Sequence, residues 1–178
     1  MFGGADNDVY FVDDPGDLVF ENINEGTDAV FSTVNYTLTA NVENLVLQGS
    51  GNLSGTGNGL PNQVYGNAGD NALDGGGGSD LLNGGAGHDT LTGGTGNDIF
   101  AFNSGQADGD TLADFTGNGS GVGDSLLFVG YGTAAQGATF TQIGATNQWQ
   151  IHSGLGGPDE IITFLNGAPV DPSDFSFA

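Results

Sequence analysis

The sequence predicts an all-β fold in which short strands and tight turns wind into a flattened spiral, a β-solenoid. Three observations lead to this prediction. Glycine accounts for 35 of the 178 residues and recurs in strict register between residues 75 and 98. Asp80, Asp89 and Asp98 are evenly spaced, and a large apolar residue follows each of them two positions later. Strand-like alternation of apolar residues recurs in the remainder of the chain, and no helix of ordinary length is predicted.

Residues 1–54 are predicted to form N-terminal coils of the solenoid, in which the repeat is degenerate. Two pairs, Asp8 with Tyr10 and Asp17 with Val19, keep the same spacing of an acid and an apolar residue. The following stretch, AVFSTVNYTLTANVENLVLQGSGNL, alternates like strands and contains few glycines. We interpret it as longer coils of the same solenoid.

Residues 55–114 contain a tract of nonapeptide repeats. The complete repeats follow one another directly: 75–83, 84–92 and 93–101. Two degraded repeats precede them and keep the phase, with Asn62 and Asn71 in the place of the aspartate. This regular tract is where the sequence predicts the structure most specifically.

The length of the repeat fits a short strand followed by a turn of about six residues. Because successive side chains of a strand point to opposite faces, Leu82, Leu91 and Phe100 are predicted to point inward. Glycines at the first, second and fourth positions permit positive φ and close approach of backbones. Two repeats then close one coil, so alternate repeats stack on the same edge.

Stacking places turn carboxylates such as those of Asp80 and Asp98 about 4.8 Å apart, the spacing between strands. At an effective dielectric of about 20, two charges at this distance repel by about 3 kcal/mol. Calcium accepts oxygen ligands at about 2.3–2.6 Å, so an ion between two coils would reach both carboxylates, and turn carbonyls would complete the site. We therefore predict that the tract folds only when calcium binds.

Residues 115–178 are predicted to form a β-rich cap. The segments 138–143 and 147–152 are expected to form a hairpin, and 160–165 is expected to form another strand. A solenoid ends in unpaired strand edges, which favour aggregation unless they are covered. This region is therefore expected to cover the end of the solenoid.

Composition limits the partners of this chain. It has 22 Asp and Glu residues, no Lys or Arg, and two histidines. Nucleic acids and anionic membrane surfaces are bound mainly through Lys and Arg, so neither is expected as a partner. An acidic, glycine-rich composition is also typical of intrinsic disorder, but the strict register of the glycines favours a folded chain. Cysteine does not occur, and no apolar run reaches the length of a transmembrane helix.

The three complete repeats, GGGGSDLLN, GGAGHDTLT and GGTGNDIFA, resemble the repeats-in-toxin (RTX) family, whose pattern is G-G-x-G-x-D-x-U-x. The resemblance implies a parallel β-roll with calcium in its turns, about three to six ions in all. It also implies a secreted bacterial protein that a type I secretion apparatus exports and that folds outside the cell. The last residues, DFSFA, are similar to the uncleaved C-terminal signal of the family. Asp6 and Asn71 depart from the pattern, so their turns are expected to bind calcium weakly or not at all.

The candidate calcium ligands lie in the repeat turns and in the segment that follows them. The candidates at the first and third positions of the turns are Gly57, Gly59, Gly66, Ala68, Gly75, Gly77, Gly84, Ala86, Gly93 and Thr95. The candidates that would bind through side chains are Asn62, Asn71, Asp80, Asp89, Asp98, Asp108 and Asp110.

We interpret the chain as a non-catalytic, calcium-binding module of a larger exported protein, and we expect it to be monomeric. The alternative is a carbohydrate-binding module or a segment of an adhesin, because Trp149, Tyr131 and Tyr65 could stack on sugars. Without Lys or Arg, the glycan would have to be neutral or bridged by calcium. Catalytic motifs such as G-x-S-x-G and H-E-x-x-H do not occur, and His88 and His152 are expected to be solvated.

Overall fold

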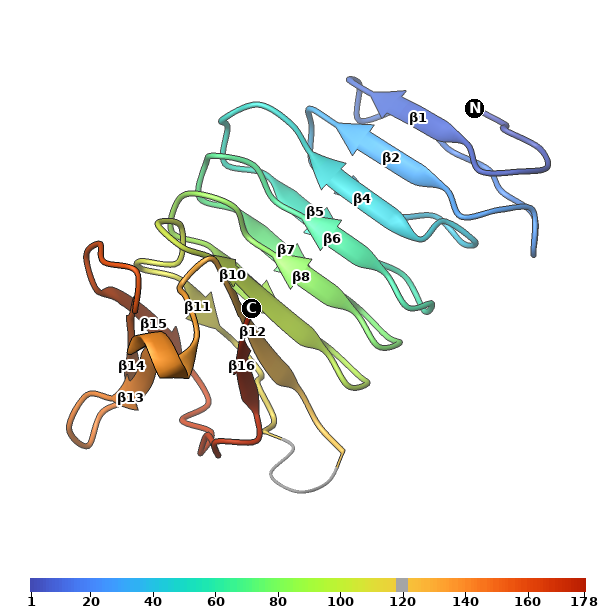
Figure 1. The fold of residues 1–178 in the computed structure, drawn as a ribbon. Helices are drawn as coiled ribbons and strands as arrows, with labels where there is room; N and C mark the ends of the chain where they lie inside the picture. The colour runs from blue at the N-terminus through green and yellow to red at the C-terminus, as the bar shows by residue number, and fades with distance from the viewer. Residues whose placement is uncertain (118–121) are drawn as a thin grey trace.

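The computed structural model describes residues 1–117 and 122–178, and in these residues the strands form two sheets of eight (Figure 1). In spatial order, the first sheet contains β1 (Val9–Val12), β2 (Ala29–Ser32), β4 (Asn44–Leu47), β6 (Gln63–Tyr65), β8 (Leu81–Asn83), β10 (Ile99–Asn103), β12 (Ser125–Val129) and β16 (Phe175–Phe177). The second contains β13 (Thr139–Gln142), β14 (Gln148–His152), β15 (Glu160–Phe164), β11 (Thr111–Leu112), β9 (Thr90–Thr92), β7 (Ala72–Asp74), β5 (Ser54–Thr56) and β3 (Tyr36–Thr37). A single 3-10 turn, η1 (Ala134–Gln136), precedes β13 in this part of the chain.

The nonapeptide tract forms a parallel β-roll, in which successive strands alternate between the two sheets (Figure 1). In the first sheet, Gln63 of β6 lies opposite Leu81 of β8, which lies opposite Ile99 of β10. In the second sheet, Ala72 of β7 lies opposite Thr90 of β9. Each partner is thus two repeats along the chain. The prediction that two repeats form one coil is confirmed.

The core is a column of apolar side chains between the two sheets. Leu82, Leu91 and Phe100 have no exposed surface, as predicted from strand alternation. The residues on either side of Leu82 and Leu91 point away from the core and are half-buried or exposed. Burial of one such side chain contributes about 1.5–3 kcal/mol, which is small against the cost of ordering a whole repeat.

The N-terminal coils continue the roll with longer turns. The strand-like stretch that follows Asp28 forms β2, β3 and β4, as predicted. Tyr10 and Val19, the apolar members of the two degenerate pairs, are buried. Phe2 and Phe20 form an isolated parallel bridge, and their rings stack with centroids 5.0 Å apart.

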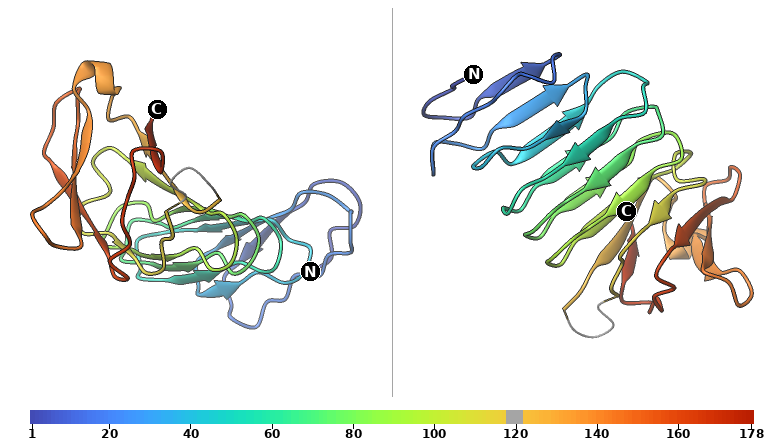
Figure 2. Two further views of the ribbon diagram at one scale, coloured as in Figure 1. Left: turned by 90° about the horizontal axis from the view of Figure 1, so that it is seen from below. Right: turned by 180° about the vertical axis from the view of Figure 1, so that it is seen from behind.

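The C-terminal region combines antiparallel and parallel pairing at one end of the roll (Figure 2). β13 and β14 form the predicted hairpin, with Thr139 opposite His152. β14 also pairs antiparallel with β15, the predicted third strand, and β15 pairs in parallel with β11. β16 pairs in parallel with β12. Within the described residues, none of the helical segments has the length and apolar character needed to span a bilayer.

Aromatic side chains fill the space between β12 and the hairpin. The ring of Phe128 lies 4.9 Å from that of Phe140 and 5.2 Å from that of Phe177. Trp149 stacks on Phe140 at 4.9 Å, so it packs within the hairpin. Tyr131 has no exposed surface. The interpretation of Tyr131 as a residue that stacks on sugars is therefore wrong, because its ring completes the core.

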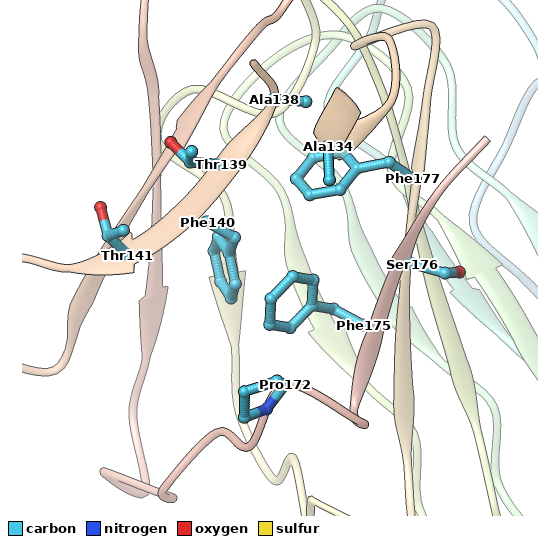
Figure 3. A pocket seen from close by; sticks show the side chains of 9 residues that line it. All are labelled: Ala134, Ala138, Thr139, Phe140, Thr141, Pro172, Phe175, Ser176 and Phe177. Atoms are coloured by element: carbon cyan, nitrogen blue, oxygen red, sulfur yellow. The ribbon is translucent and has the colours of Figure 1, made fainter. Parts of the chain in front are cut away.

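An open apolar pocket of about 530 Å³ separates β13 from β16 (Figure 3). The rings of Phe140, Phe175 and Phe177 line it, together with Pro172. The pocket is far along the chain from the repeat tract and contains no titratable side chain among its lining residues.

Candidate metal-binding turns

Each complete repeat forms a turn that joins the two sheets. Residues 75–80 lead from β7 to β8, and residues 84–89 lead from β8 to β9. Gly76 and Gly78 have φ of 89° and 120°, a left-handed conformation that side chains other than glycine rarely adopt. The glycines at the same positions of the other two turns also have positive φ. The second and fourth positions therefore require glycine because of the backbone conformation.

The first position of each turn requires glycine because a side chain there would have no room. A Cβ atom on Gly75 would overlap with Oδ2 of Asp80 and with the carbonyl oxygen of Gly93. A Cβ atom on Gly84 would likewise overlap with Oδ2 of Asp89. The missing side chains leave small spaces lined by carboxylate and carbonyl oxygens. Gly57 and Gly66 have the same surroundings, with an asparagine oxygen in the place of the carboxylate oxygen.

The third-position residues form contacts between successive turns of the same edge. Gly77 and Thr95 form a parallel bridge between two turns of the same edge. The N–H of Ala86 donates to a carbonyl of the preceding turn on its edge, at 3.0 Å. Gly59 and Ala68, which belong to the degraded repeats, are exposed.

The sixth-position carboxylates connect successive coils, an arrangement that we call the carboxylate ladder. On the first edge, Oδ1 of Asp80 accepts from the backbone N–H of Asn62 at 2.7 Å. Oδ1 of Asp98 accepts from the N–H of Asp80 at 2.9 Å. Oδ1 of Asp124 continues the ladder by accepting from the N–H of Asp98 at 3.0 Å. Each carboxylate thus binds the backbone of the coil on its N-terminal side.

The second edge carries an equivalent ladder. Oδ1 of Asp89 accepts from the N–H of Asn71 at 2.8 Å, and Oδ1 of Asp110 accepts from the N–H of Asp89 at 2.9 Å. Asp110 is 2% exposed. Asp108 is exposed, and its Oδ1 accepts from the N–H of Ile161 at 3.1 Å. Of these two candidates, the structure places Asp110 in the ladder and Asp108 at the surface.

Two acids outside the candidate set lie near the C-terminal ends of the two ladders. Asp124 belongs to the first ladder, and Glu160 accepts from the N–H groups of Gly105 and Ala107 at 2.8 and 2.7 Å. Asp124 precedes Leu126 in the pattern of the repeats, DSL. In DEI the same pattern points to Asp159, which is exposed, whereas the buried acid is its neighbour Glu160, two residues before the buried Ile162. The nine-residue phase is lost before both Asp124 and Glu160, so spacing could not select them.

One oxygen of each complete-repeat aspartate lacks a hydrogen-bond partner in the part of the chain that the structure describes. These atoms are Oδ2 of Asp80, Asp89 and Asp98, and they are buried. Burial raises the pKa of Asp80 and of Asp89 to about 6, and it also raises the pKa of Asp98. An unpaired buried carboxylate is costly. Because the chain contains no Lys or Arg, no cationic side chain other than histidine can neutralise it.

These residues fit a bound calcium ion. Oδ2 of each aspartate faces the space that the first-position glycine of its turn leaves open, and at Gly75 the carbonyl oxygen of Gly93 lies beside that space. Calcium is bound in proteins by such carboxylate and carbonyl oxygens. The donor set and the negative charge therefore both suit a hard divalent cation.

In the degraded repeats, the asparagine side chains form hydrogen bonds with backbone groups of their own turns and of the neighbouring coil. Oδ1 of Asn62 accepts from the N–H of Asn58 at 2.7 Å, and its Nδ2 donates to the carbonyl oxygen of Val42 at 3.0 Å. Oδ1 of Asn71 accepts from the N–H of Asn67 at 2.7 Å. An amide carries both a donor and an acceptor, so these turns gain their contacts without a charge.

A family model described as the RTX calcium-binding nonapeptide repeat matches the tract in three overlapping stretches: 56–91, 65–100 and 74–112. The repeats of this family are found in secreted bacterial proteins.

Two known proteins are similar to parts of the chain. Over 69 residues, 39% of its length, the chain is 36% identical to the endo-1,3-1,4-beta-glycanase ExsH of Rhizobium meliloti (strain 1021). The match covers 15% of that protein. The solution structure of the AlgE6R3 subunit from the Azotobacter vinelandii mannuronan C5-epimerase has a TM-score of 0.50 and 25% sequence identity. That likeness covers 74% of this chain and 81% of the subunit.

Proposed function

Because residues 56–112 of the chain are RTX calcium-binding nonapeptide repeats, we propose that their turns bind calcium through the ladder aspartates and that the roll folds when they do so. The observation that carries this proposal is the set of buried Oδ2 atoms of Asp80, Asp89 and Asp98, which no described residue contacts by a hydrogen bond. These carboxylates are negative, buried and stacked along the edges of the roll.

The residues that would hold the ion come from two stacked turns. Asp80 and Asp98 would offer Oδ2 on one edge, and Asp89 would do so on the other. The first-position candidates Gly75 and Gly93 and the third-position candidates would offer backbone carbonyl oxygens. When bound, calcium supplies positive charge and takes six to eight oxygen ligands at about 2.3–2.6 Å. We propose about three to six ions for the chain, with those of the complete repeats bound most firmly.

Metal-free folding is expected to be unfavourable. Carboxylates about 4.8 Å apart repel each other, by about 3 kcal/mol at an effective dielectric of about 20. An ion present at about a hundredfold excess over its dissociation constant stabilises the folded chain by about 2.7 kcal/mol, and several ions act together. Folding and binding would then occur as one event.

Asp89→Asn tests this proposal, since the amide retains Oδ1 for the N–H of Asn71 but removes the buried charge. The variant should bind one calcium ion fewer and require about tenfold more calcium to fold. Its metal-free form should be more stable than that of the wild type. Circular dichroism during calcium titration, with magnesium as the control cation, measures the calcium midpoint and the β-structure of the metal-free form, and equilibrium dialysis with calcium counts the bound ions.

Asp13→Asn is the matched control, because it removes the same charge from an exposed position. It should leave the calcium midpoint unchanged. A metal-free wild-type chain that is as rich in β-structure as the calcium-loaded one would contradict the proposal.

We also propose that the chain serves the export and extracellular folding of a larger bacterial protein, without catalysing a reaction itself. The family of the repeats supports this proposal, and residues 174–178, DFSFA, are the candidate signal. Asp174 precedes β16, whose Phe175 and Phe177 pack on the core of the folded chain. A signal in this strand would therefore be accessible only before folding. Secretion of a fusion to the chain, with and without residues 174–178, measures this role.

A second candidate function is binding of a neutral glycan on the outer face of the first sheet. Phe11, Phe31, Val46 and Tyr65 lie opposite one another on successive strands, and the rings of Phe11 and Phe31 stack at 5.6 Å. Phe11 is 67% exposed. Flat rows of aromatic rings suit sugar faces, and the β-glycan named for one of the similar proteins favours such a ligand. A glycan array on the calcium-loaded chain, with Phe11→Ala as comparison, tests this candidate; equal profiles for both would exclude this face.

A further inference from the structure

Three carboxylates converge at the N-terminal end of the roll, outside the matched repeats. Asp8 precedes β1, Asp28 precedes β2, and Glu21 follows the bridge residue Phe20. One oxygen from each carboxylate lies within 4.8 Å of the others. Asp28 is 1% exposed, and its Oδ1 accepts from the N–H of Asp8 at 2.8 Å. The cluster is therefore fixed by the backbone of two coils.

The cluster has buried oxygens to offer a ligand. Oδ2 of Asp8 and Oε2 of Glu21 are buried and accept no hydrogen bond from any described residue. The hydroxyl of Tyr10 donates to Oε1 of Glu21, which orients that side chain. Burial and the carboxylates of Asp28 and Asp8 raise the pKa of Glu21. The chain contains no Lys or Arg that could neutralise the three charges.

The cluster differs from a repeat turn at one residue. Gly3 has the same relation to Asp8 as Gly75 has to Asp80, because a Cβ atom on Gly3 would overlap with Oδ2 of Asp8. The bridge between Phe2 and Phe20 places Glu21 beside Gly3. Where the next coil of the repeats has a glycine, this coil has a glutamate whose carboxylate points into the space.

We propose that Asp8, Glu21 and Asp28 form a cation-binding site of their own, with calcium as the expected ion. Affinity for calcium rises with the number of charged ligands, so three carboxylates should bind more tightly than a repeat turn does. This site would hold the first two coils together, although Asp6 replaces a glycine in the first turn. This proposal departs from the expectation that this turn binds weakly or not at all.

Terbium emission sensitised by Tyr10 tests the site, because the tyrosine hydroxyl contacts the carboxylate of Glu21. Terbium binds calcium sites, and an excited tyrosine next to the ion makes it emit. The wild-type chain should show this emission at terbium concentrations too low to fill the repeat turns. Glu21→Gln should weaken terbium binding about tenfold or more, whereas Asp13→Asn should not change it. Tyr10→Phe should lose the emission but retain the bound ion.

Equilibrium dialysis with calcium provides a second readout. Glu21→Gln should bind one ion fewer than the wild type and still show the calcium-induced circular dichroism change of the repeats. That change reports the proposed function, so the two proposals fail separately. Unchanged terbium affinity in Glu21→Gln, equal weakening in Asp13→Asn, or undiminished emission in Tyr10→Phe would overturn the site.

Discussion

At the scale of single residues, the acidic side chains distinguish the turns that could bind a cation from those that could not. Asp89 and Asn71 occupy the same repeat position on one edge, yet only the aspartate has a buried oxygen without a partner among the described residues. The sequence identified these positions because the acid recurs in phase with an inward apolar residue. It could not identify Glu21, because this glutamate lies in a degenerate coil, where no repeat spacing singles out its position.

The pH dependence of the metal-free chain follows from the same residues. The pKa of Asp80 and of Asp89 is raised to about 6 and that of Asp110 to about 8, in each case chiefly because burial disfavours the charged form. In an unfolded chain these groups titrate near pH 4, so the folded chain retains protons that the unfolded chain releases. The metal-free fold should lose stability as the pH rises from about 4 to about 8.

Circular dichroism in the presence of a chelator should therefore show more β-structure at about pH 5 than at about pH 8. Calcium added at about pH 6 should release protons, because the carboxyls bind it in the charged form. Equal β-structure at both pH values would contradict the assignment of buried, unpaired carboxylates.

At the scale of the turn, glycine has two distinct roles, one in backbone conformation and one in space. Gly85 has φ of 93°, and a Cβ atom on it would overlap with the carbonyl oxygen of Asn67. Gly59 has no described atom within 4 Å of the position of a Cβ atom. Sequence reasoning predicted that the turns need glycine, but only the structure separates the positions that tolerate a side chain.

Substitution of these two glycines by alanine measures the difference. Gly85→Ala should destabilise the calcium-loaded roll by about 1 kcal/mol or more, because its conformation is strained and its Cβ atom meets the backbone. Gly59→Ala should leave stability within about 0.5 kcal/mol of the wild type. Urea unfolding at saturating calcium gives both values; equal losses would refute the distinction.

At the scale of the whole molecule, the repeat period predicts the roll but not its continuation. Two nonapeptides per coil follow from the spacing of Asp80 and Asp98, and the register confirms them. Beyond Phe100 the ladder partners are 21 and 26 residues apart, at Asp110 and Asp124. Insertions in the turns change the spacing in sequence without changing the stacking in space, so periodicity cannot locate these coils.

Truncation after residue 114 tests the role expected for the C-terminal region. Removal of residues 115–178 takes away β12 and β15, the partners of β10 and β11, and the ring of Phe115 that packs on Phe100. The truncated chain should require more calcium to fold and should aggregate more readily. Calcium midpoints from circular dichroism check this; an unchanged midpoint would argue against a cap.

The hydrogen bonds of the carboxylate ladder all run in one direction along the roll, from the backbone N–H of one coil to the carboxylate of the coil on its C-terminal side. Because Oδ1 of Asp98 accepts from the N–H of Asp80, the turn of Asp80 gains this side-chain bond only when the coil on its C-terminal side has formed. In a chain that enters a calcium-rich medium with its C-terminus leading, each new coil would find the carboxylate of the next coil already in place. In a chain that emerges from its N-terminus, the N–H groups of the ladder would stay unpaired until the following coil had emerged.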